Sequence, residues 1–250
     1  MYDRATLNAI FHPEERMLTF SDFFKKLEGF PCPELFEQHI DGFEDITYVW
    51  DVLKRIQQGF VAKMVQPQIL GIVEDGAWLR GKDIFIGRNT KVQAGAMIIG
   101  PAIIGSNVEI RHGAYIRGHV IIGDNAVVGH ASELGRSVLL PDAKAPHFNY
   151  VGDSILGSHV NLGAGTKLSN LKNDGTEVKV LAAGIGYKTG MRKFGAILGD
   201  GCMLGCNSVT NPGTVMAPGC RVYPNATVSG YTSPSTIVKL RQNLATSRAS

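Results

Sequence analysis

The stretch IGRNTKVQAGAMIIGPAIIGSNVEIRHGAYIRGHVIIGDNAVV, residues 86–128, carries an aliphatic residue at every sixth position. The spacing is kept beyond this stretch, so that the aliphatic series is Ile86, Val92, Ile98, Ile104, Ile110, Ile116, Ile122, Val128, Leu134 and Leu140. A small or β-branched residue follows each of the first nine by four positions, from Thr90 to Val138. Neither the 3.6-residue period of an α-helix nor the two-residue alternation of an amphipathic strand produces this pattern.

A solenoid of short parallel strands does produce it, with three hexads forming one triangular coil. Such hexads are typical of the left-handed parallel β-helix, which departs from the usual right-handed crossover. The pattern returns in a second phase at Leu156, Leu162, Leu168, Leu198, Leu204, Met216, Val222 and Val228. Cys202 and Cys220 occupy small positions one coil apart, so we expect them to stack as reduced core residues.

The repeat is interrupted twice. Leu140 and Leu156 are separated by four residues more than two hexads, which predicts a short extruded loop that holds His147 over a cleft. A longer excursion is expected between Leu168 and Leu198, where the pattern is mostly lost. Loops that leave a rigid scaffold often carry functional sites. LAAGIG, residues 181–186, is similar to a nucleotide phosphate loop, but the strand-to-helix context that such a loop needs is not expected here.

The fold class predicted is therefore mainly β: a left-handed β-helix at 67–232, a helical extension at 1–66, and a short helix and tail at 233–250. Ser21 is the expected N-cap of a first helix, in SDFFKKLEGF. Ile46, Val49, Trp50, Leu53 and Ile56 form a helical stripe that ends at Gly59. We expect this stripe to pack on the first coil or on a neighbouring subunit, where it would protect exposed strand edges.

Composition limits the partners. A net charge of +3 over 250 residues gives no reason to expect a nucleic-acid partner. No signal-peptide pattern opens the chain, and no apolar run approaches the ~20 residues that cross a membrane. Four unevenly spaced cysteines match neither a disulfide framework nor a paired zinc motif, so a cytoplasmic location without a metal is expected.

Five histidines lie in the repeat region. His112 and His130 are one coil apart and should stack on the surface, but two imidazoles do not complete a zinc site. We expect His119 and His159 to be ordinary surface residues. His147 differs because it falls where the repeat changes phase and is surrounded by polar residues. A histidine there is a candidate general base, since its pKa lies near neutral pH.

The sequence around His147 resembles a known family. The pattern K-A-G-H-x-x-Y-x-G-D of the acetyltransferase half of the bifunctional glucosamine-1-phosphate enzyme is matched by Lys144, Ala145, Pro146, His147, Tyr150, Gly152 and Asp153. Its V-N-I-G-A-G-T run is matched by residues 160–166. The chain is more similar still to the β-helix half of sugar-1-phosphate nucleotidylyltransferases that also acetylate amino sugars. The resemblance covers about residues 68–230, and we expect no nucleotidyltransferase domain in this sequence, with residues 1–66 in its place.

This resemblance implies an acetyl-CoA-dependent N-acetyltransferase acting on an amino-sugar phosphate. It implies catalytic roles for His147 as the base, for Glu133 as its orienting carboxylate and for Asn170 beside the thioester. The implied substrate-binding residues are Arg117, Lys144, Tyr150 and Asn161. Lys167, Lys172 and Lys179 would contact phosphates, including those of coenzyme A. The expected assembly is a homotrimer with coenzyme A between neighbouring subunits.

Two departures from the family keep an alternative open. Gly135 stands where the bifunctional enzyme has a sugar-phosphate lysine, although Arg136 is adjacent. The family's C-N-Y-D-G becomes SNLKNDG at 169–175, with two additional residues. The missing lysine and the N-terminal extension favour one alternative, a non-catalytic remnant of a nucleotidylyltransferase that serves as a trimeric scaffold and binds sugar nucleotides. The altered motif leaves the substrate open, and a third interpretation keeps the acyltransferase but changes the acyl donor or acceptor.

Overall fold

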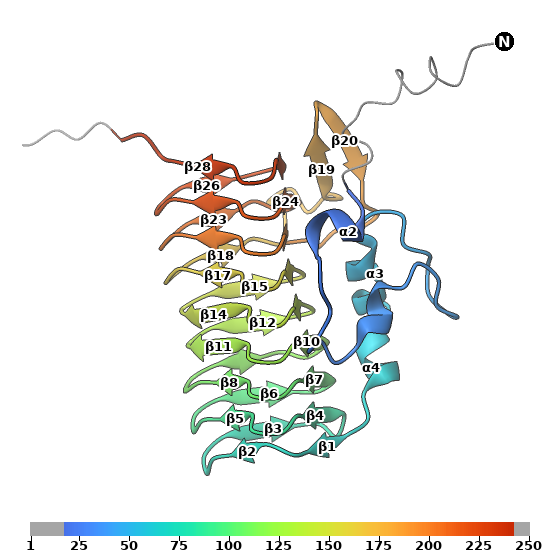
Figure 1. The fold of residues 1–250 in the computed structure, drawn as a ribbon, viewed down its shortest axis with the longest axis vertical. Coiled ribbons are helices and arrows are strands. Elements are labelled where there is room, and N and C mark those ends of the chain that lie inside the picture. The colour runs from blue at the N-terminus through green and yellow to red at the C-terminus, as the bar shows by residue number, and fades with distance from the viewer. Residues whose placement is uncertain (1–17, 243–250) are drawn as a thin grey trace, which may run out of the picture.

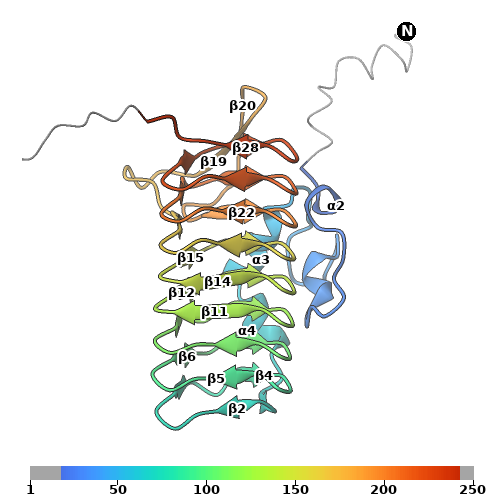
Figure 2. The same cartoon turned by 60° about the vertical axis from the view of Figure 1, so that its left-hand side comes forward.

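The computed structural model describes residues 18–242, and its body is a left-handed parallel β-helix, which confirms the predicted fold class. Three parallel sheets, here called A, B and C, form the walls of a triangular prism (Figure 1). Successive coils stack along one axis, and the coloured ribbon climbs steadily from the first coil to the last (Figure 2).

The strands are short and repeat in the order A, B, C. Sheet A contains β1 (Gln68–Ile69), β4 (Ile84–Ile86), β7 (Ala102–Ile104), β10 (Val120–Ile122), β13 (Val138–Leu139), β16 (Ile155–Leu156), β21 (Ala196–Leu198), β24 (Thr214–Met216) and β27 (Tyr231–Thr232). Sheet B contains β2 (Ile72–Val73), β5 (Lys91–Val92), β8 (Glu109–Ile110), β11 (Val127–His130), β14 (Lys144–His147), β17 (Asn161–Leu162), β22 (Met203–Leu204), β25 (Arg221–Val222) and β28 (Ile237–Val238). Sheet C contains β3 (Trp78–Arg80), β6 (Met97–Ile99), β9 (Tyr115–Ile116), β12 (Glu133–Gly135), β15 (Tyr150–Gly152), β18 (Lys167–Leu168), β23 (Val209–Thr210) and β26 (Thr227–Val228).

The hexad aliphatics fill the interior of the prism as expected. From Ile86 to Leu134 every member of the series is fully buried in one continuous core. The second series, from Leu156 to Val228, joins the same core, and Cys202 and Cys220 are buried free thiols within it. Each buried aliphatic side chain contributes about 1.5–3 kcal/mol relative to an exposed one, so the repeat itself stabilises the solenoid.

The first predicted interruption is wrong. Leu139, and not Leu140, is the inward residue that pairs with Ile122, and Ala145 and Val151 continue this inward series at intervals of six. Residues 141–155 therefore continue the wall as β14, β15 and the start of β16, with no extruded loop. Leu140 is also fully buried, but outside the prism against the N-terminal extension.

The shift in phase comes from a tighter corner between sheets C and A. Leu134 is followed by the inward Leu139 after five residues instead of six, and Val151 by Leu156 likewise. At both corners a buried serine hydroxyl, of Ser137 or Ser154, donates to the carbonyl two residues before it, at 2.9 and 2.8 Å. These serines close the shortened turns.

The described part of the N-terminal extension, which begins at residue 18, is only partly helical. It contains α2 (Phe20–Phe23), the 3-10 helix η2 (Pro33–Phe36), α3 (Asp51–Gln57) and α4 (Phe60–Met64), joined by irregular segments. Thr19, not Ser21, is the N-cap of α2, and the predicted stripe becomes helical at Asp51 rather than Ile46. Its apolar members from Val49 to Ile56 are nevertheless fully buried.

The extension covers the outer face of sheet A instead of capping the first coil, which corrects our expectation (Figure 1). Outward residues of sheet A, such as Ile121, Val138 and Ile155, join Trp50 and Leu53 in a second buried cluster. At the far end of the stack this face is covered by an antiparallel hairpin of β19 (Lys179–Ala182) and β20 (Ile185–Lys188). The predicted excursion is thus confirmed, and LAAGIG forms the turn of this hairpin.

The C-terminal helix expected after Ser235 is not observed in the described part of the chain. Residues 237–238 instead form β28, which pairs with β25 and completes sheet B. Residues 243–250 lie outside the described range. No helix within 18–242 has both the length and the apolar character of a membrane span.

Arg55 organises the extension. Its side chain is fully buried and donates five hydrogen bonds of 2.6–3.1 Å to the carbonyl oxygens of Leu35, Glu37, Gln38 and Glu44.

We expect Arg55→Leu to destabilise the protein by about 3 kcal/mol or more, because buried carbonyls lose their donors. Arg55→Lys should lower the free energy of unfolding by less, since the lysine ammonium group can still donate some of these hydrogen bonds. Urea unfolding measures both, and equal stability of Arg55→Leu and wild type would contradict this role.

Candidate functional site

Four of the predicted residues gather on the outer face of sheet C. Glu133, Tyr150 and Lys167 are register partners on neighbouring strands. The Arg117 guanidinium, one coil before, pairs with the Glu133 carboxylate at 2.8 Å. Glu133 is therefore engaged with Arg117, and no hydrogen bond joins it to the His147 ring among the described residues.

Two glycines form the floor between these side chains. Gly135 and Gly152 pair side by side at the ends of β12 and β15. The Arg117 guanidinium lies over Gly135, where an added Cβ would meet Nη2 at 3.1 Å. The Tyr150 hydroxyl and the Asn170 amide lie over Gly152, where a Cβ would meet them at 2.8 and 2.6 Å. The glycines thus leave room for groups that longer side chains would displace.

Asn170 is held from two sides. Its Nδ2 donates to Asp153 at 2.5 Å, and its Oδ1 accepts from the Tyr150 hydroxyl at 3.2 Å. Arg136 donates to the same carboxylate through Nε and Nη2, at 2.7 and 3.0 Å, and this hydrogen bonding raises the pKa of Arg136. Gln57, from α3, donates to Asp153 at 3.2 Å. The Asp153 carboxylate is fully buried, so these donors replace its hydration.

His147 lies in the corner between sheets B and C, in a column of three histidines. His130 is its register partner, and the His112 and His130 rings stack with centroids 5.6 Å apart, as expected. Nδ1 of His130 and of His112 donate to the carbonyls of His112 and Ala94, because a carbonyl can only accept. His147 is exposed, and within residues 18–242 neither of its ring nitrogens has a hydrogen-bond partner.

The remaining substrate-binding candidates lie on sheet B. Lys144 and Asn161 are register partners on β14 and β17, on the other side of the corner from Tyr150. The structure therefore divides the predicted residues into two sets, with His147 in the corner between them. No group of three or more metal-ligating side chains occurs in the described range.

Lys172 and Lys179 line one groove of about 770 Å³ beside β18 and the hairpin. Leu171 and Leu181, 40 % and 59 % exposed, give this groove an apolar wall next to Asn170. Lys172 also contacts Thr176 and Asp174, at 2.5 and 3.2 Å. Lys167 is not part of the groove wall and donates to the Gly165 carbonyl at 2.7 Å.

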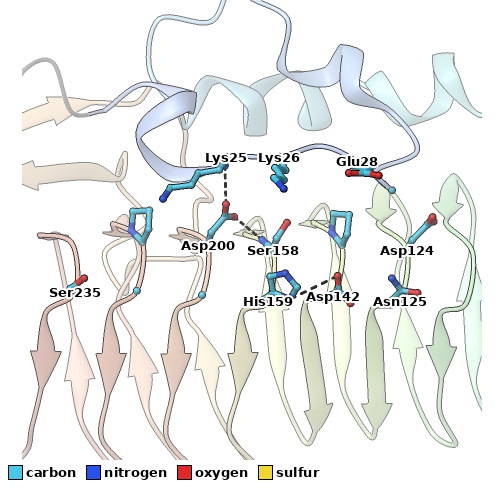
Figure 3. Close-up of a pocket in the computed structure, with 15 residues that line it drawn as sticks. Lys25, Lys26, Glu28, Asp124, Asn125, Asp142, Ser158, His159, Asp200 and Ser235 are labelled. Atoms are coloured by element: carbon cyan, nitrogen blue, oxygen red, sulfur yellow. Dashed lines mark hydrogen bonds and ion pairs between the residues drawn. The ribbon is translucent and has the colours of Figure 1, made fainter.

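A second groove, of about 820 Å³, lies at the corner between sheets A and B, beneath residues 24–29 of the extension (Figure 3). The overlying segment is fixed by Asp200, which accepts from the Lys25 and Ser158 amides at 2.8 Å each. Burial raises the pKa of Asp200. The charges around this groove are mixed, and His159 faces Asp142 there at 3.9 Å. None of the predicted site residues lines it, so we place the candidate site on sheet C and its neighbouring corners.

Sequence reasoning missed one member of the site. Asp153 belongs to the motif around His147 and Arg136 stands beside Gly135, but nothing near Gln57 in the sequence connects it to either. Gln57 follows the apolar stripe of α3, where a glutamine normally faces solvent. Only the packing of α3 on sheet A shows that the side-chain amide of Gln57 reaches the corner between sheets C and A.

Comparison with known proteins agrees with this architecture. A family model described as the GMPPB C-terminal domain matches residues 98–237, more than half of the chain. The chain belongs to this family. The family match covers most of the solenoid, including His147 and the residues on sheet C.

Several curated relatives carry enzyme names. The bifunctional sugar-1-phosphate nucleotidylyltransferase/acetyltransferase of Sulfurisphaera tokodaii is 35 % identical over 185 residues, which are 74 % of this chain and 46 % of that protein. The bifunctional protein GlmU of Methanococcus vannielii is 33 % identical over 218 residues, 86 % of this chain and 51 % of that protein. This family member therefore spans about half the length of these relatives.

Two shorter proteins match over most of their own length. The uncharacterized acetyltransferase YaiX of Escherichia coli is 32 % identical over 162 residues, 65 % of this chain and 70 % of that protein. Among solved structures, the UDP-N-acetylglucosamine acyltransferase of Francisella novicida superposes with a TM-score of 0.51 at 18 % identity, covering 69 % of this chain and 66 % of that one. The latter likeness concerns the fold alone.

The paired glycines provide a matched test of the site. We expect Gly152→Ala to destabilise the protein by about 1–3 kcal/mol, because the new methyl group would displace both Asn170 and Tyr150. Gly135→Ala meets only the flexible end of Arg117 and should change stability by about 0.5 kcal/mol or less. Urea unfolding of the two variants measures the difference. Equal destabilisation would show that the Tyr150–Asn170 contact is not tightly packed.

His119 is not the ordinary surface residue we expected. It is half-buried, its φ is 52°, and its Nδ1 is buried with no hydrogen-bond partner in the described structure. Burial lowers the pKa of His119, and the charge of Arg136 lowers it further. The fold therefore favours the neutral ring.

This lowered pKa predicts a pH effect on stability. The stabilising contribution of neutral His119 is complete above the unfolded-state pKa, about 6.5, and is lost as the pH falls below it, because the unfolded chain binds the proton first. His119→Asn tolerates the left-handed backbone and removes this titration. We expect the free energy of unfolding to fall more steeply from pH 7.5 to 5.5 in wild type than in this variant. Parallel profiles would contradict the assignment.

Proposed function

We propose that this protein is an acetyl-CoA-dependent N-acetyltransferase whose acceptor is an amino-sugar phosphate, with His147 as the general base. The observation that carries the proposal is that the His147 ring is exposed and makes no hydrogen bond within residues 18–242. The ring lies at a corner between two sets of polar residues. Its neighbours His112 and His130 instead have Nδ1 committed to backbone carbonyls.

The reaction needs a base because an ammonium group cannot attack a thioester. His147 would accept one proton from the ammonium group, and the neutral amine would then attack the acetyl carbonyl carbon. The C–S bond then breaks, the proton on His147 passes to the departing thiolate to give free coenzyme A, and the nitrogen releases its second proton to solvent. Negative charge on the carbonyl oxygen in the transition state requires an N–H donor. Asn170 would lie beside this oxygen.

The acceptor would bind across sheet C. Arg117 is a suitable phosphate ligand, since a guanidinium presents several donors in one plane. Glu133 occupies its Nε, which fixes the plane and leaves the terminal nitrogens for the phosphate. Tyr150 would contact the sugar, while Lys144 and Asn161 would contact the acceptor from sheet B.

Acetyl-CoA would bind in the groove lined by Lys172 and Lys179. The exposed leucines at 171 and 181 match the apolar pantetheine arm, and the two ammonium groups match phosphates. The groove adjoins Asn170, which brings the donor towards the proposed acceptor site. Lys167, one coil from Tyr150, would supply a further positive charge.

A homotrimer is proposed as the working assembly. On sheet C, Trp78 is 58 % exposed and Tyr115 38 % exposed, and they lie in the same register row as Glu133 and Tyr150. Contact with a neighbouring subunit would bury these rings and close the cleft over the donor.

His147→Ala tests the base directly. We expect thiol release from acetyl-CoA in the presence of an amino-sugar phosphate to fall about a hundredfold or more, because the acceptor amine loses the base that takes its proton. His112→Ala, two coils away in the same column, is the control and should stay within about twofold of wild type. Comparable rates in the two variants would remove His147 from the mechanism.

A scaffold without catalysis is the competing function, favoured by the absence of a lysine at position 135. Calorimetric titration with acetyl-CoA separates the two functions. The enzyme should bind acetyl-CoA, and Lys172→Ala and Lys179→Ala should weaken binding. A scaffold would give no heat with acetyl-CoA and would retain affinity for a sugar nucleotide.

A further inference from the structure

We infer that Gln57, from the N-terminal extension, is a positioning residue of the acceptor site. It acts through Asp153 on Asn170 and Tyr150. This inference rests on the proposed function and extends it, because it makes the extension part of the site. The extension lies outside the region matched by the family model, which begins at residue 98.

The first step concerns the hydrogen-bond donors that the buried Asp153 carboxylate requires. Its carboxylate is fully buried at the C–A corner, and its backbone has φ 46°, a conformation that costs a non-glycine residue about 1–3 kcal/mol. Arg136 supplies two donors and Asn170 one, and Gln57 supplies the donor from the solvent side. A buried carboxylate that lost one of its donors would draw in water or move.

The second step is the orientation of Asn170. Because Asp153 is an acceptor, it selects the Nδ2 side of the Asn170 amide. The Oδ1 side is thereby turned to the Tyr150 hydroxyl, 3.2 Å away. Any shift of Asp153 is transmitted to both residues through hydrogen bonds.

The third step is the second hydrogen bond of Gln57. Its Nε2 also donates to the Lys193 carbonyl at 2.9 Å, at the end of the excursion that carries the hairpin. The chain after Lys193 returns to the site, since the Phe194 and Gly195 amides donate to the carbonyls of Asn170 and Asp153, at 2.9 and 2.8 Å. One amide group thus links the extension, the corner and the returning strand.

Gln57 can hold this position because the rest of its helix is fixed. Leu53 and Ile56 on α3 are fully buried in the cluster that covers sheet A. The Gln57 side chain itself is exposed, so it covers Asp153 from outside rather than forming part of the core. Its role is therefore to shield and orient more than to support the fold.

Gln57→Ala, with Gln58→Ala as the matched control, provides the kinetic test. Gln58 is the next residue, is also exposed and donates only to Glu44 at 3.3 Å. We expect Gln57→Ala to raise the KM of the amino-sugar phosphate about threefold, the value of one ordinary hydrogen bond, and to lower kcat, because Asn170 shifts together with Asp153. Gln58→Ala should match wild type. Equal acceptor KM values in both variants would overturn the inference.

Gln57→Glu adds a pH signature that a structural role alone would not give. The new carboxyl group would face Asp153, so its pKa should rise. The acceptor KM of this variant should be high at pH 8, where the introduced carboxylate has no proton to donate. It should recover towards pH 6, where protonation of the introduced group restores a donor to Asp153. Gln58→Glu should follow the wild-type profile, and an identical profile in Gln57→Glu would count against the inference.

Hydrogen exchange gives a readout that does not need turnover. The amides of Phe194 and Gly195 should exchange faster in Gln57→Ala than in Gln58→Ala. If wild type has no acetyltransferase activity, the proposed function fails, and this exchange difference alone decides whether Gln57 positions the corner. Unchanged protection in both variants would overturn it.

Discussion

The structure depends on the parallel ladder that places each residue over its counterpart in the next coil. Neighbouring strands in such a ladder are about 4.8 Å apart, so residues at equivalent positions form columns along the axis. The aliphatic columns make the core. Polar columns line the two corners beside the candidate site: His112, His130 and His147 at one corner, and His119, Arg136 and Asp153 at the other. In this fold a site is built from residues seventeen or eighteen apart in the chain, which lie directly above and below one another.

The shortened corners show how the repeat adapts locally. Where sheet C turns into sheet A, two consecutive coils lack one residue, and Arg136 and Asp153 adopt positive φ values of 47° and 46°. Such backbone is unfavourable for bulky residues, whereas elsewhere asparagines such as Asn89 and Asn107 occupy the left-handed positions. The Arg136–Asp153 ion pair and the buried serines offset this cost. The phase change in the sequence thus marks strained backbone at the candidate site.

The hexad pattern was sufficient to predict the solenoid, because few folds except a solenoid turn one side chain inward at every sixth residue. It could not locate Leu139, since two adjacent leucines both suit a buried position and only the tight corner selects between them. The motif around His147 gave the candidate residues but could not predict which of them pair with one another. Arg117 rather than His147 holds Glu133, because the ladder places their strands side by side. The packing of the N-terminal extension was harder still to predict. Its apolar stripe shows that one helix face is buried but does not show which surface covers that face.

The polar network at the C–A corner is better explained by positioning than by stability. Burying a carboxylate and a guanidinium together often gains little over an apolar pair of similar volume, while it leaves every partner with a fixed orientation. Asp153 accepts hydrogen bonds from three separate segments: the corner at Arg136, the start of the excursion at Asn170, and α3 at Gln57. A solenoid wall needs none of these contacts to close, because the coils before β12 form without them. A site that must hold the Asn170 amide and the Tyr150 phenol at fixed places does need these contacts. The outer face of a β-sheet offers no cavity that would keep a side chain in one position.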